Sequence, residues 1–377
     1  MSSFTFHNVA LRAFAVAVPR HVITADTSDR RTAKFVKQMG VEQVHLSITE
    51  QTPLDLGYVA LKHALAQVGW QPQQLDCVVF DTQVPDFWGG SGNSSLIHHY
   101  LDLREDCATL DLTVGCAAFP YALSVASSIL SSSSDVKRLA LLIGDCVWYL
   151  QGSKAELLAN KQHLFGDATG VVLLEKSDFG HTPEIKTKLF AQGHGYINLF
   201  AAPSGRDNWH MDADQFVLPT GITVANHQGR VLMHMNGMAI HEFSTGKVVD
   251  TIKEHYGAKL QDFDYYVFHQ ANRQILDAIT ARLELNPDQV LISFDQYGNT
   301  SSCSALTTIC HQLHDLDKPA RIFNASFGIG LAWGFSELVL EPGTVSAIIE
   351  TDHHFTEHVL KPVYVQSHAA QSAPAAL

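Results

Sequence analysis

Short apolar runs alternate with helical patterns along most of the chain, from about residue 9 to residue 340. The runs predict strands at residues 9–18, 75–80, 108–114, 138–144, 171–175, 185–195, 263–268, 289–293, 320–326 and 334–340. The stretches between them predict helices at residues 52–68, 94–103, 117–130, 228–256, 270–283 and 303–313. Strands that are apolar throughout, separated by helices, predict an α/β fold whose sheets are covered by helices on both faces.

The order of these elements repeats. The strand at 75–80 and its following helix correspond to the strand at 263–268 and its helix, and the strand at 138–144 corresponds to residues 321–327. We therefore predict two similar α/β halves packed together, residues 1–180 and 181–365, followed by a disordered Ala/Ser/Pro-rich tail, 366–377.

Composition and charge narrow the function classes. The chain has 377 residues, of which 46% are hydrophobic and 17% charged, and its net charge is −13. This acidic balance argues against binding to nucleic acids or to anionic membranes. It leaves room for an acidic carrier-protein partner, because a local basic patch is enough for docking.

Cysteine usage and the apolar runs favour a soluble cytoplasmic protein. The six cysteines show no C-x-x-C spacing, which indicates reduced thiols. The N-terminus lacks the basic and apolar regions of a signal peptide. The longest strongly apolar run, residues 139–150, contains Asp145 and is too short to span a bilayer.

Cys116 lies where an apolar run ends at Gly115 and a helix of small residues begins. At such a turn the sulfur lies near unpaired backbone N–H groups and the positive end of a helix dipole, and both favour the thiolate. The alternative is a buried structural cysteine, which taken alone is the more common case.

Two further residues occupy equivalent turns. His269 directly follows the strand at 263–268, and Asn299 lies in the turn before the helix at 303–313. A lone histidine is often a surface or core residue, and a lone asparagine is often a turn residue. The duplication, however, places both beside one cleft with Cys116, so together they indicate a catalytic site.

Four ordered segments resemble the signatures of β-ketoacyl-acyl-carrier-protein synthase III, a family of thiolase-fold condensing enzymes. They are Gly-Cys116-Ala-Ala-Phe-Pro, His269-Gln-Ala-Asn, Gly-Asn299-Thr-Ser-Ser and Phe327-Gly-Ile-Gly-Leu-Ala-Trp-Gly. The resemblance implies a thiolase fold, with two duplicated halves and two mixed sheets in an α-β-α-β-α arrangement.

The resemblance also implies a mechanism. Cys116 would be acylated by a thioester, and His269 and Asn299 would hydrogen-bond a malonyl-type extender as it loses CO₂. The backbone N–H groups of Cys116 and Ile329 would form the oxyanion hole for the later attack. The residues that we expect to contact substrate are Phe87, Trp88, Asn272 and Gly328. The substrates would be CoA or phosphopantetheine thioesters, with acyl-CoA or an acyl carrier protein as partner, and with no cofactor or metal of the protein's own.

Other features place the chain within the superfamily. The C-terminal Gly-rich turn lacks the second cysteine of non-decarboxylating thiolases, and Asn299 replaces the second histidine of elongating synthases.

Two departures from the family pattern are Arg273, one position early, and residues 32–41, which replace the usual adenine-contacting segment. They favour a homologue in polyketide or fatty-acid-derived specialised metabolism. The alternatives are an acyltransferase that makes esters or amides, and a ketosynthase/cyclase that makes a resorcinol or cyclohexanedione ring.

Three further expectations concern assembly and alternatives. Members of this fold pair through the strand before the nucleophile, so we expect a homodimer, or a heterodimer with a paralogue, with Phe87 and Trp88 entering the neighbour's cleft. A non-catalytic supporting subunit would lack the three candidate residues, which are all present. His353, His354 and His358 could suggest a metal site, but we expect a solvated tail there.

Overall fold

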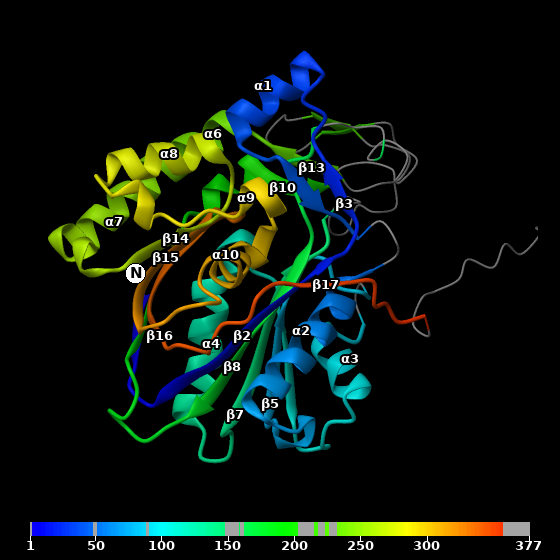
Figure 1. Ribbon diagram of the computed structural model, residues 1–377, viewed down its shortest axis with the longest axis vertical. Helices are drawn as coiled ribbons and strands as arrows, with labels where there is room; N and C mark the ends of the chain where they lie inside the picture. Colours follow the sequence, from blue (N-terminus) through cyan, green and yellow to red (C-terminus); the bar gives the residue numbers. More distant parts are fainter. Residues whose placement is uncertain are drawn as a thin grey trace, which may run out of the picture.

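Two mixed β-sheets form the framework of the protein (Figure 1). The structure is a computed structural model that describes residues 2–47, 51–87, 90–147, 158, 162–202, 215–217, 223–225 and 232–356. Within these residues, the first sheet has six strands in the order β17-β2-β8-β7-β5-β6. They are β2 (Val9–Pro19), β5 (Cys77–Asp81), β6 (Ala108–Leu112), β7 (Arg138–Asp145), β8 (Ala168–Lys176) and β17 (Ile349–Thr351).

The second sheet has five strands among the described residues, in the order β1-β9-β16-β15-β14. They are β1 (Ser2–Phe6), β9 (Ile185–Ala191), β14 (Tyr265–Phe268), β15 (Ala320–Gly328) and β16 (Ala332–Leu340). The order β2-β8-β7-β5 in the first sheet matches β9-β16-β15-β14 in the second, as the repeated sequence pattern predicts. The two halves also exchange edge strands, since β1 joins the second sheet and β17 joins the first.

Helices fill the space between the sheets and cover their outer faces. Figure 1 shows α4 (Ala118–Ser132) and α10 (Ser304–Gln312) between the sheets, where their apolar side chains join one core with both inner faces. The outer face of the first sheet is covered by α2 (Pro53–Val68) and α3 (Asn93–Tyr100). The outer face of the second is covered by α7 (Val249–Tyr256) and α8 (Arg273–Arg282). The α-β-α-β-α thiolase arrangement is therefore confirmed.

The strand sequences explain this layering. Along β2, Phe14, Val16 and Val18 face the core that contains α4 and α10. The alternate residues, Ala13, Ala15 and Ala17, face the core under α2. Both faces of the strand are buried, which is why its sequence is a continuous apolar run and not an alternating one.

The capping chemistry of α2 follows the sequence closely. The Thr52 hydroxyl accepts from the Asp55 N–H, the Asp55 carboxylate accepts from the Thr52 N–H, and Pro53 occupies the first turn. This capping box satisfies backbone groups that would otherwise lack partners. The helix ends at Gly69, whose φ of 70° is the left-handed conformation that glycine adopts without strain.

Two predicted elements differ in the structure. The predicted helix at 228–256 contains a strand, β13 (Leu232–Met235), which pairs with β10 (Leu199–Ala202). The chain continues as α6 (Gly237–Glu242), the π-helical segment Phe243–Val248 and α7. The reason is that residues 232–235 hydrogen-bond to a distant strand, which local periodicity does not record. The predicted strand at 289–293 is only an isolated bridge between Val290 and Tyr266.

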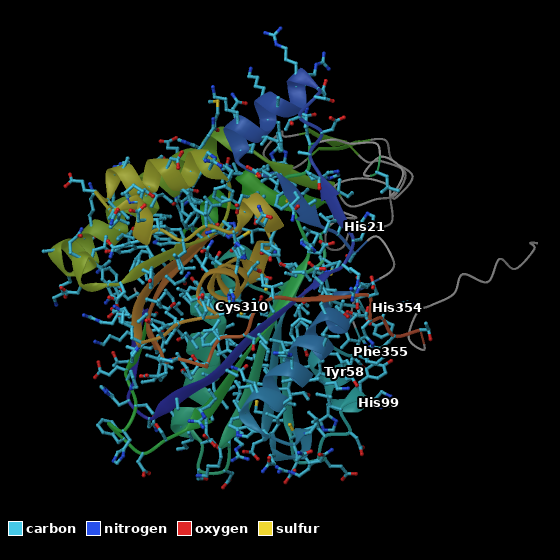
Figure 2. The ribbon with its side chains drawn as sticks, viewed as in Figure 1. His21, Tyr58, His99, Cys310, His354 and Phe355 are labelled. Atoms are coloured by element: carbon cyan, nitrogen blue, oxygen red, sulfur yellow. The ribbon has the colours of Figure 1, made fainter. Side chains whose placement is uncertain are left out.

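The expectation of a solvated tail holds for His354, which is exposed, and is wrong for His353, whose ring stacks on Tyr58 with ring centroids 5.1 Å apart. β17 pairs with β2, and the Phe355 ring stacks on Tyr100, with ring centroids 3.6 Å apart, and meets Tyr58 edge-on. We define residues 346–356 as the C-terminal strap. Figure 2 labels Phe355 of this strap and Tyr58 of α2. His358 and the predicted disordered tail, 366–377, lie outside the described residues.

Smaller elements complete the described chain. They are β3 (Val22–Thr24), β4 (Gln43–His45), α1 (Arg30–Met39), α9 (Phe294–Tyr297) and the hairpin of β11 (Gln215–Val217) with β12 (Thr223–Ala225). None of the helices in the described ranges has both the length and the apolar character needed to cross a bilayer.

Candidate active site

Cys116 lies in a short 3₁₀ turn, Gly115–Ala117, that leads from β6 into α4. Gly115 has a φ of 74°, and a Cβ atom there would come within 2.5 Å of Ile329 Cγ2 and 2.6 Å of Gln83 Cδ, so this position requires glycine. Cys116 is the one cysteine of six that is not fully buried. The nucleophile candidate is therefore placed at a turn that other segments enclose tightly.

The thiol of Cys116 is poorly solvated. Burial raises its pKa to about 11, while hydrogen bonds from the Ile329 N–H, the Ser301 hydroxyl and its own N–H favour the thiolate, and the Asp145 carboxylate opposes it. The prediction of a favoured thiolate is wrong, because the effect of the helix N-terminus is outweighed by the desolvation of the sulfur. The resting side chain at neutral pH is the thiol.

His269 follows β14, and its backbone N–H donates to the Ala325 carbonyl at 2.9 Å. Its ring is buried and meets the Phe327 ring edge-on, with centroids 5.5 Å apart. Desolvation lowers its pKa to about 4, so the imidazole is neutral at physiological pH. Nδ1 lies 2.7 Å from the Ser304 hydroxyl. If Ser304 donates this bond, Nε2 carries the hydrogen and can donate to a ligand.

Asn299 is fixed from both sides in the turn after α9. Its backbone N–H donates to the Leu164 carbonyl at 2.8 Å, and its own carbonyl accepts from the Gly166 N–H at 3.1 Å. The side-chain Oδ1 accepts from the Ser301 N–H at 2.9 Å. Among the described residues, neither Nδ2 of Asn299 nor Nε2 of His269 has a hydrogen-bond partner.

The three candidates converge through shared neighbours. Ser301 contacts both the Cys116 sulfur and the Asn299 side chain. Ser304, three residues further on, holds His269. On the opposite side, the chain from Phe327 to Ile329 contacts the His269 ring and the Cys116 sulfur. The predicted triad therefore surrounds one point, at the junction of the two halves.

The other predicted contacts are placed as follows. A Cβ atom at Gly328 would lie 2.4 Å from Cys116 Cβ, so the backbone passes directly over the nucleophile. Asn272 caps α8, where its side chain accepts from the Ile275 N–H at 3.0 Å. Phe87 is half-buried on the loop after β5, and Trp88 lies outside the described residues. The N–H groups of Ile329 and Cys116 both approach the sulfur.

The structure adds residues that sequence reasoning missed. Gln83 and Asp145 lie beneath the site, and Ser301 and Ser304 contact its members. Asp145 left a weak signal, as a carboxyl group at the end of an apolar strand, and the two serines belong to the motif after Asn299. Gln83 left none, because its partner Ser301 is 218 positions away.

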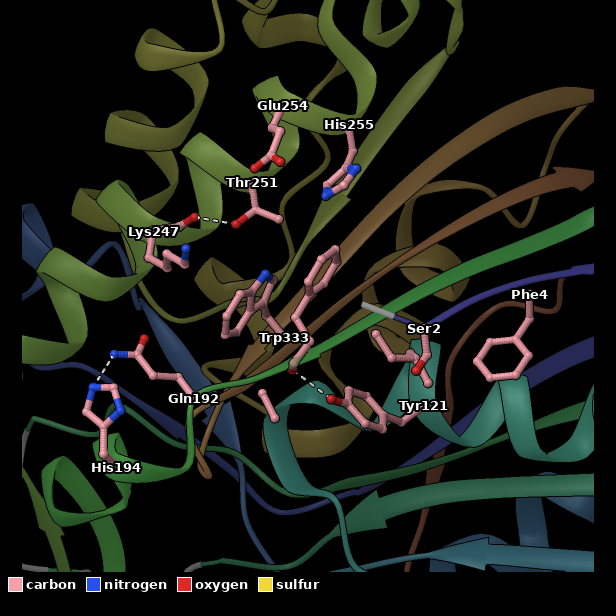
Figure 3. A pocket seen from close by; sticks show the side chains of 13 residues that line it. Ser2, Phe4, Tyr121, Gln192, His194, Lys247, Thr251, Glu254, His255 and Trp333 are labelled. Carbon is pink, nitrogen blue, oxygen red and sulfur yellow. Dashed lines mark hydrogen bonds between the residues drawn. The ribbon is translucent and has the colours of Figure 1, made fainter.

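A separate groove of about 1150 Å³ opens beside the second sheet (Figure 3). It is walled by the stacked rings of Phe190 and Trp333, by Tyr121 and by polar residues of the π-helical segment and α7. The Tyr121 hydroxyl donates to the Phe190 carbonyl at its base, at 2.7 Å. Cys116, His269 and Asn299 do not line this groove.

The layered fold and a Cys-His-Asn set at the junction of two duplicated halves define a thiolase-fold condensing enzyme. Comparison with known proteins gives the family. The family model of 3-oxoacyl-[acyl-carrier-protein] synthase III matches residues 110–193, and the model of its C-terminal part matches residues 227–338, together more than half of the chain. The chain belongs to this family, whose members are acyltransferases.

Individual relatives agree with this assignment. β-Ketoacyl-[acyl-carrier-protein] synthase III of Symbiobacterium thermophilum is 29% identical over 349 residues, which cover 86% of this chain and 96% of the relative. The crystal structure of a 3-oxoacyl-(acyl-carrier-protein) synthase from Burkholderia xenovorans superimposes with a TM-score of 0.80, at 23% identity, over 93% of this chain and 99% of that one. The priming β-ketosynthase of the R1128 polyketide pathway gives a TM-score of 0.72 at 20% identity, over 90% and 98% of the two chains.

Proposed function

We propose that this enzyme forms a carbon–carbon bond between an acyl group on Cys116 and a malonyl- or β-ketoacyl-type extender, in polyketide or fatty-acid-derived specialised metabolism. The observation that carries the proposal is the pair of neutral N–H donors beside Cys116, His269 Nε2 and Asn299 Nδ2, which have no hydrogen-bond partner among the described residues. A developing enolate oxygen needs such donors, and they act most strongly where water is excluded.

The proposed reaction has two stages. In the first, the Cys116 sulfur displaces the thiol of an acyl thioester, and the sulfur's proton ends on the departing thiol. In the second, the extender's carboxylate leaves as CO₂, and the electron pair passes to an enolate whose oxygen His269 and Asn299 stabilise. The enolate carbon attacks the acyl carbon, and the Cys116 sulfur leaves as a thiolate that takes up a proton from water to restore the thiol. The N–H groups of Ile329 and Cys116 stabilise the oxyanion of that attack.

Transfer of the acyl group to an alcohol or amine is the main alternative. It requires a general base, for which neutral His269 would serve, but it gives Asn299 no chemical task. The test follows two signals separately: acyl-Cys116 by intact mass, and CO₂ from a malonyl thioester. For Asn299→Ala we expect acylation within about twofold of wild type and decarboxylation reduced by about 10²-fold or more.

Two controls accompany this test. Asn286→Ala removes an asparagine that caps a distant 3₁₀ turn, and should leave both signals unchanged. Cys116→Ala should gain no acyl mass, because the other five cysteines are buried. A wild-type enzyme that acylates readily but releases no CO₂ from any malonyl or β-keto-acid extender would contradict the condensing reaction and favour the acyltransferase.

We also propose that the acyl or extender group arrives on an acidic carrier protein that docks on α1 and α8. Arg30, Arg31, Lys34 and Lys37 on α1 are all exposed. Lys34 and Lys37 line a cleft of about 370 Å³ together with Arg273 of α8. None of these five forms an ion pair with a described carboxylate. On a chain of net charge −13, such a cluster favours an acidic partner.

Charge reversal tests this surface. The double variant Lys34→Glu, Lys37→Glu should raise KM for a carrier-bound thioester by about tenfold or more. At each position, attraction to an acidic group of the carrier is replaced by repulsion. The kcat, and the reaction with a short pantetheine thioester, should stay unchanged. Lys259→Glu, an exposed lysine elsewhere, is the matched control. Equal loss with the carrier and with free pantetheine would contradict docking here.

A further inference from the structure

Asp145 is a fully buried carboxyl group at the end of β7 that joins the two halves. From the first half, the Thr82 hydroxyl donates to its Oδ1 at 3.0 Å and the Gln83 N–H donates at 2.8 Å. From the second half, the Ser302 N–H donates to its Oδ2 at 3.2 Å. Asp145 therefore fixes the loop after β5 against the turn that contains Asn299 and Ser301.

The side-chain amide of Gln83 extends this network toward the nucleophile. Its Nε2 donates to Asp145 Oδ2 at 3.3 Å and to the Ser301 hydroxyl oxygen at 3.2 Å, so both of its hydrogens are used. Because Ser301 Oγ accepts from Gln83, its own hydrogen is available for another acceptor. Gln83 also lies against the Cys116 turn, because a Cβ atom at Gly115 would come within 2.6 Å of its Cδ. The Ser301 hydroxyl lowers the pKa of the Cys116 thiol, as a donor to the sulfur does.

Ser301 also contacts the second donor of the site. Its backbone N–H donates to Asn299 Oδ1 at 2.9 Å, which leaves Asn299 Nδ2 for a ligand. Ser301 has a φ of 51°, an uncommon value for a residue other than glycine. The Ser301 backbone directs its N–H to Asn299, while its side chain bonds Gln83. A strained backbone at such a point is typical of functional sites.

We propose that Gln83 is a positioning residue, which orients the Ser301 hydroxyl as a donor to the Cys116 sulfur and, through Ser301, the Asn299 amide toward the extender. The role of Asn299 rests on the function proposed above, whereas the sulfur contact does not. Glutamine suits this position because it donates two hydrogen bonds without a charge. A glutamate there would donate none and would add a second carboxylate beside Asp145.

The experiment measures alkylation of Cys116 by iodoacetamide, followed by intact mass between pH 6 and pH 11. Ser301→Ala and Gln83→Met should each slow alkylation about tenfold at pH 7.5 and throughout the range below the wild-type pKa, as loss of one hydrogen bond to a thiolate predicts. Gln83→Glu should slow it further. All variants keep Asp145, whose charge acts on the sulfur, and Asp81, whose carboxyl group accepts from the Val114 N–H before the Cys116 turn.

A matched control separates positioning from general loosening. Thr300→Val removes a buried hydroxyl one residue earlier, which bonds Thr307 at 3.1 Å and not the network, and should keep the wild-type profile. If Ser301→Ala does not fold, Ser301→Gly removes the same hydroxyl at a φ that glycine adopts freely.

Two results would overturn the proposal. One is wild-type alkylation at every pH in folded Ser301→Ala and Gln83→Met. The other is a loss of Cys116 alkylation rate in Thr300→Val as large as that in Ser301→Ala. Alkylation needs no acyl donor. A wild-type enzyme that releases no CO₂ would therefore contradict the proposed condensing function, while the alkylation series would still decide the role of Gln83.

Discussion

At the residue scale, the candidate nucleophile and its histidine are both neutral. Desolvation raises the Cys116 pKa to about 11 and lowers the His269 pKa to about 4, so the two do not form the thiolate–imidazolium pair of many cysteine enzymes. A neutral imidazole is the form that can donate from Nε2 while accepting at Nδ1. The burial that makes Cys116 a weaker acid thus keeps His269 suitable as a hydrogen-bond donor.

Asp81 gives a residue-scale prediction about stability. It is buried beneath the Cys116 turn, and its Oδ2 accepts from the Val114 N–H at 3.1 Å, while Oδ1 has no partner among the described residues. Burial and the Asp145 charge raise its pKa from 3.8 to about 8. The folded state therefore binds a proton that the unfolded state releases, and the resulting stability is full below pH 3.8 and lost as pH rises through about 8.

Asp81→Asn imitates the protonated form at every pH. Relative to wild type, we expect its free energy of unfolding to rise with pH and to exceed the wild-type value by about 2–5 kcal/mol at pH 8.5, with little difference near pH 4. Urea denaturation of both proteins at several pH values measures this. A constant difference between them across that range would show that Asp81 does not titrate with folding.

The sequence predicts the three candidate catalytic residues, but not the residues that support them. Cys116, His269 and Asn299 lie in short local motifs, each at a strand-to-helix turn that the pattern predicts. Gln83 and Asp145 act through contacts between segments 62 and 218 positions apart, which depend on the folded arrangement. Desolvation of the sulfur has the same origin, since Ile329 and Gln83 enclose its turn from distant parts of the chain.

At the element scale, the C-terminal strap connects the end of the chain to the first half. The Phe355 N–H donates to Asp55 Oδ1 at 2.7 Å, while Oδ2 of the same carboxyl group completes the capping box of α2. Gln51 holds the strap through the Thr351 and His353 carbonyls, each at 3.0 Å. One buried carboxyl group thus fixes both a helix start and the strap.

Phe355→Ala tests how much the strap stabilises the fold. Because the ring is half-buried between Tyr58 and Tyr100, we expect the free energy of unfolding to fall by about 1–3 kcal/mol, below the cost of a fully buried phenylalanine. Phe179→Ala is the control, since that side chain is 75% exposed and should change stability by less than about 0.5 kcal/mol. Equal effects in urea denaturation would mean that the strap is only loosely attached.

Elements with local signals were predicted well, and those that depend on partners were not. The capping residues of α2 and the apolar run of β2 specify their own structure. β13 and β17 are short, and each forms because a distant strand, β10 or β2, supplies its hydrogen bonds. The same reasoning explains why local periodicity predicts a helix over residues 232–235 and why no local pattern predicts β17.

At the scale of the whole molecule, the duplication accounts for the site. The turn after β6 and the turns that precede α8 and α10 face each other across the junction, so each half supplies part of the triad. The repeated order of elements in the sequence was enough to predict this, because equivalent turns in two packed copies lie on the same side of their sheets. The exchange of β1 and β17 between sheets adds a connection that the repeat does not contain.

The first sheet ends at β6, which leads to the last prediction, a dimer. Beyond β6 the described residues supply no further strand, and four of its five residues are exposed, including Leu110 at 39%. An unprotected edge with an apolar side chain favours pairing with another chain, and two copies related by a two-fold axis would pair antiparallel through β6. This would bring the Phe87 loops of the two subunits toward each other's sites.

Leu110→Asp should therefore weaken the dimer by about 30-fold or more, since it places two carboxylates at the centre of the contact. Sedimentation equilibrium measures this, with Met238→Asp, 84% exposed on α6, as a control that should not matter. A wild-type protein that is monomeric at micromolar concentration, or a Leu110→Asp variant that dimerises like the control, would contradict an interface at β6.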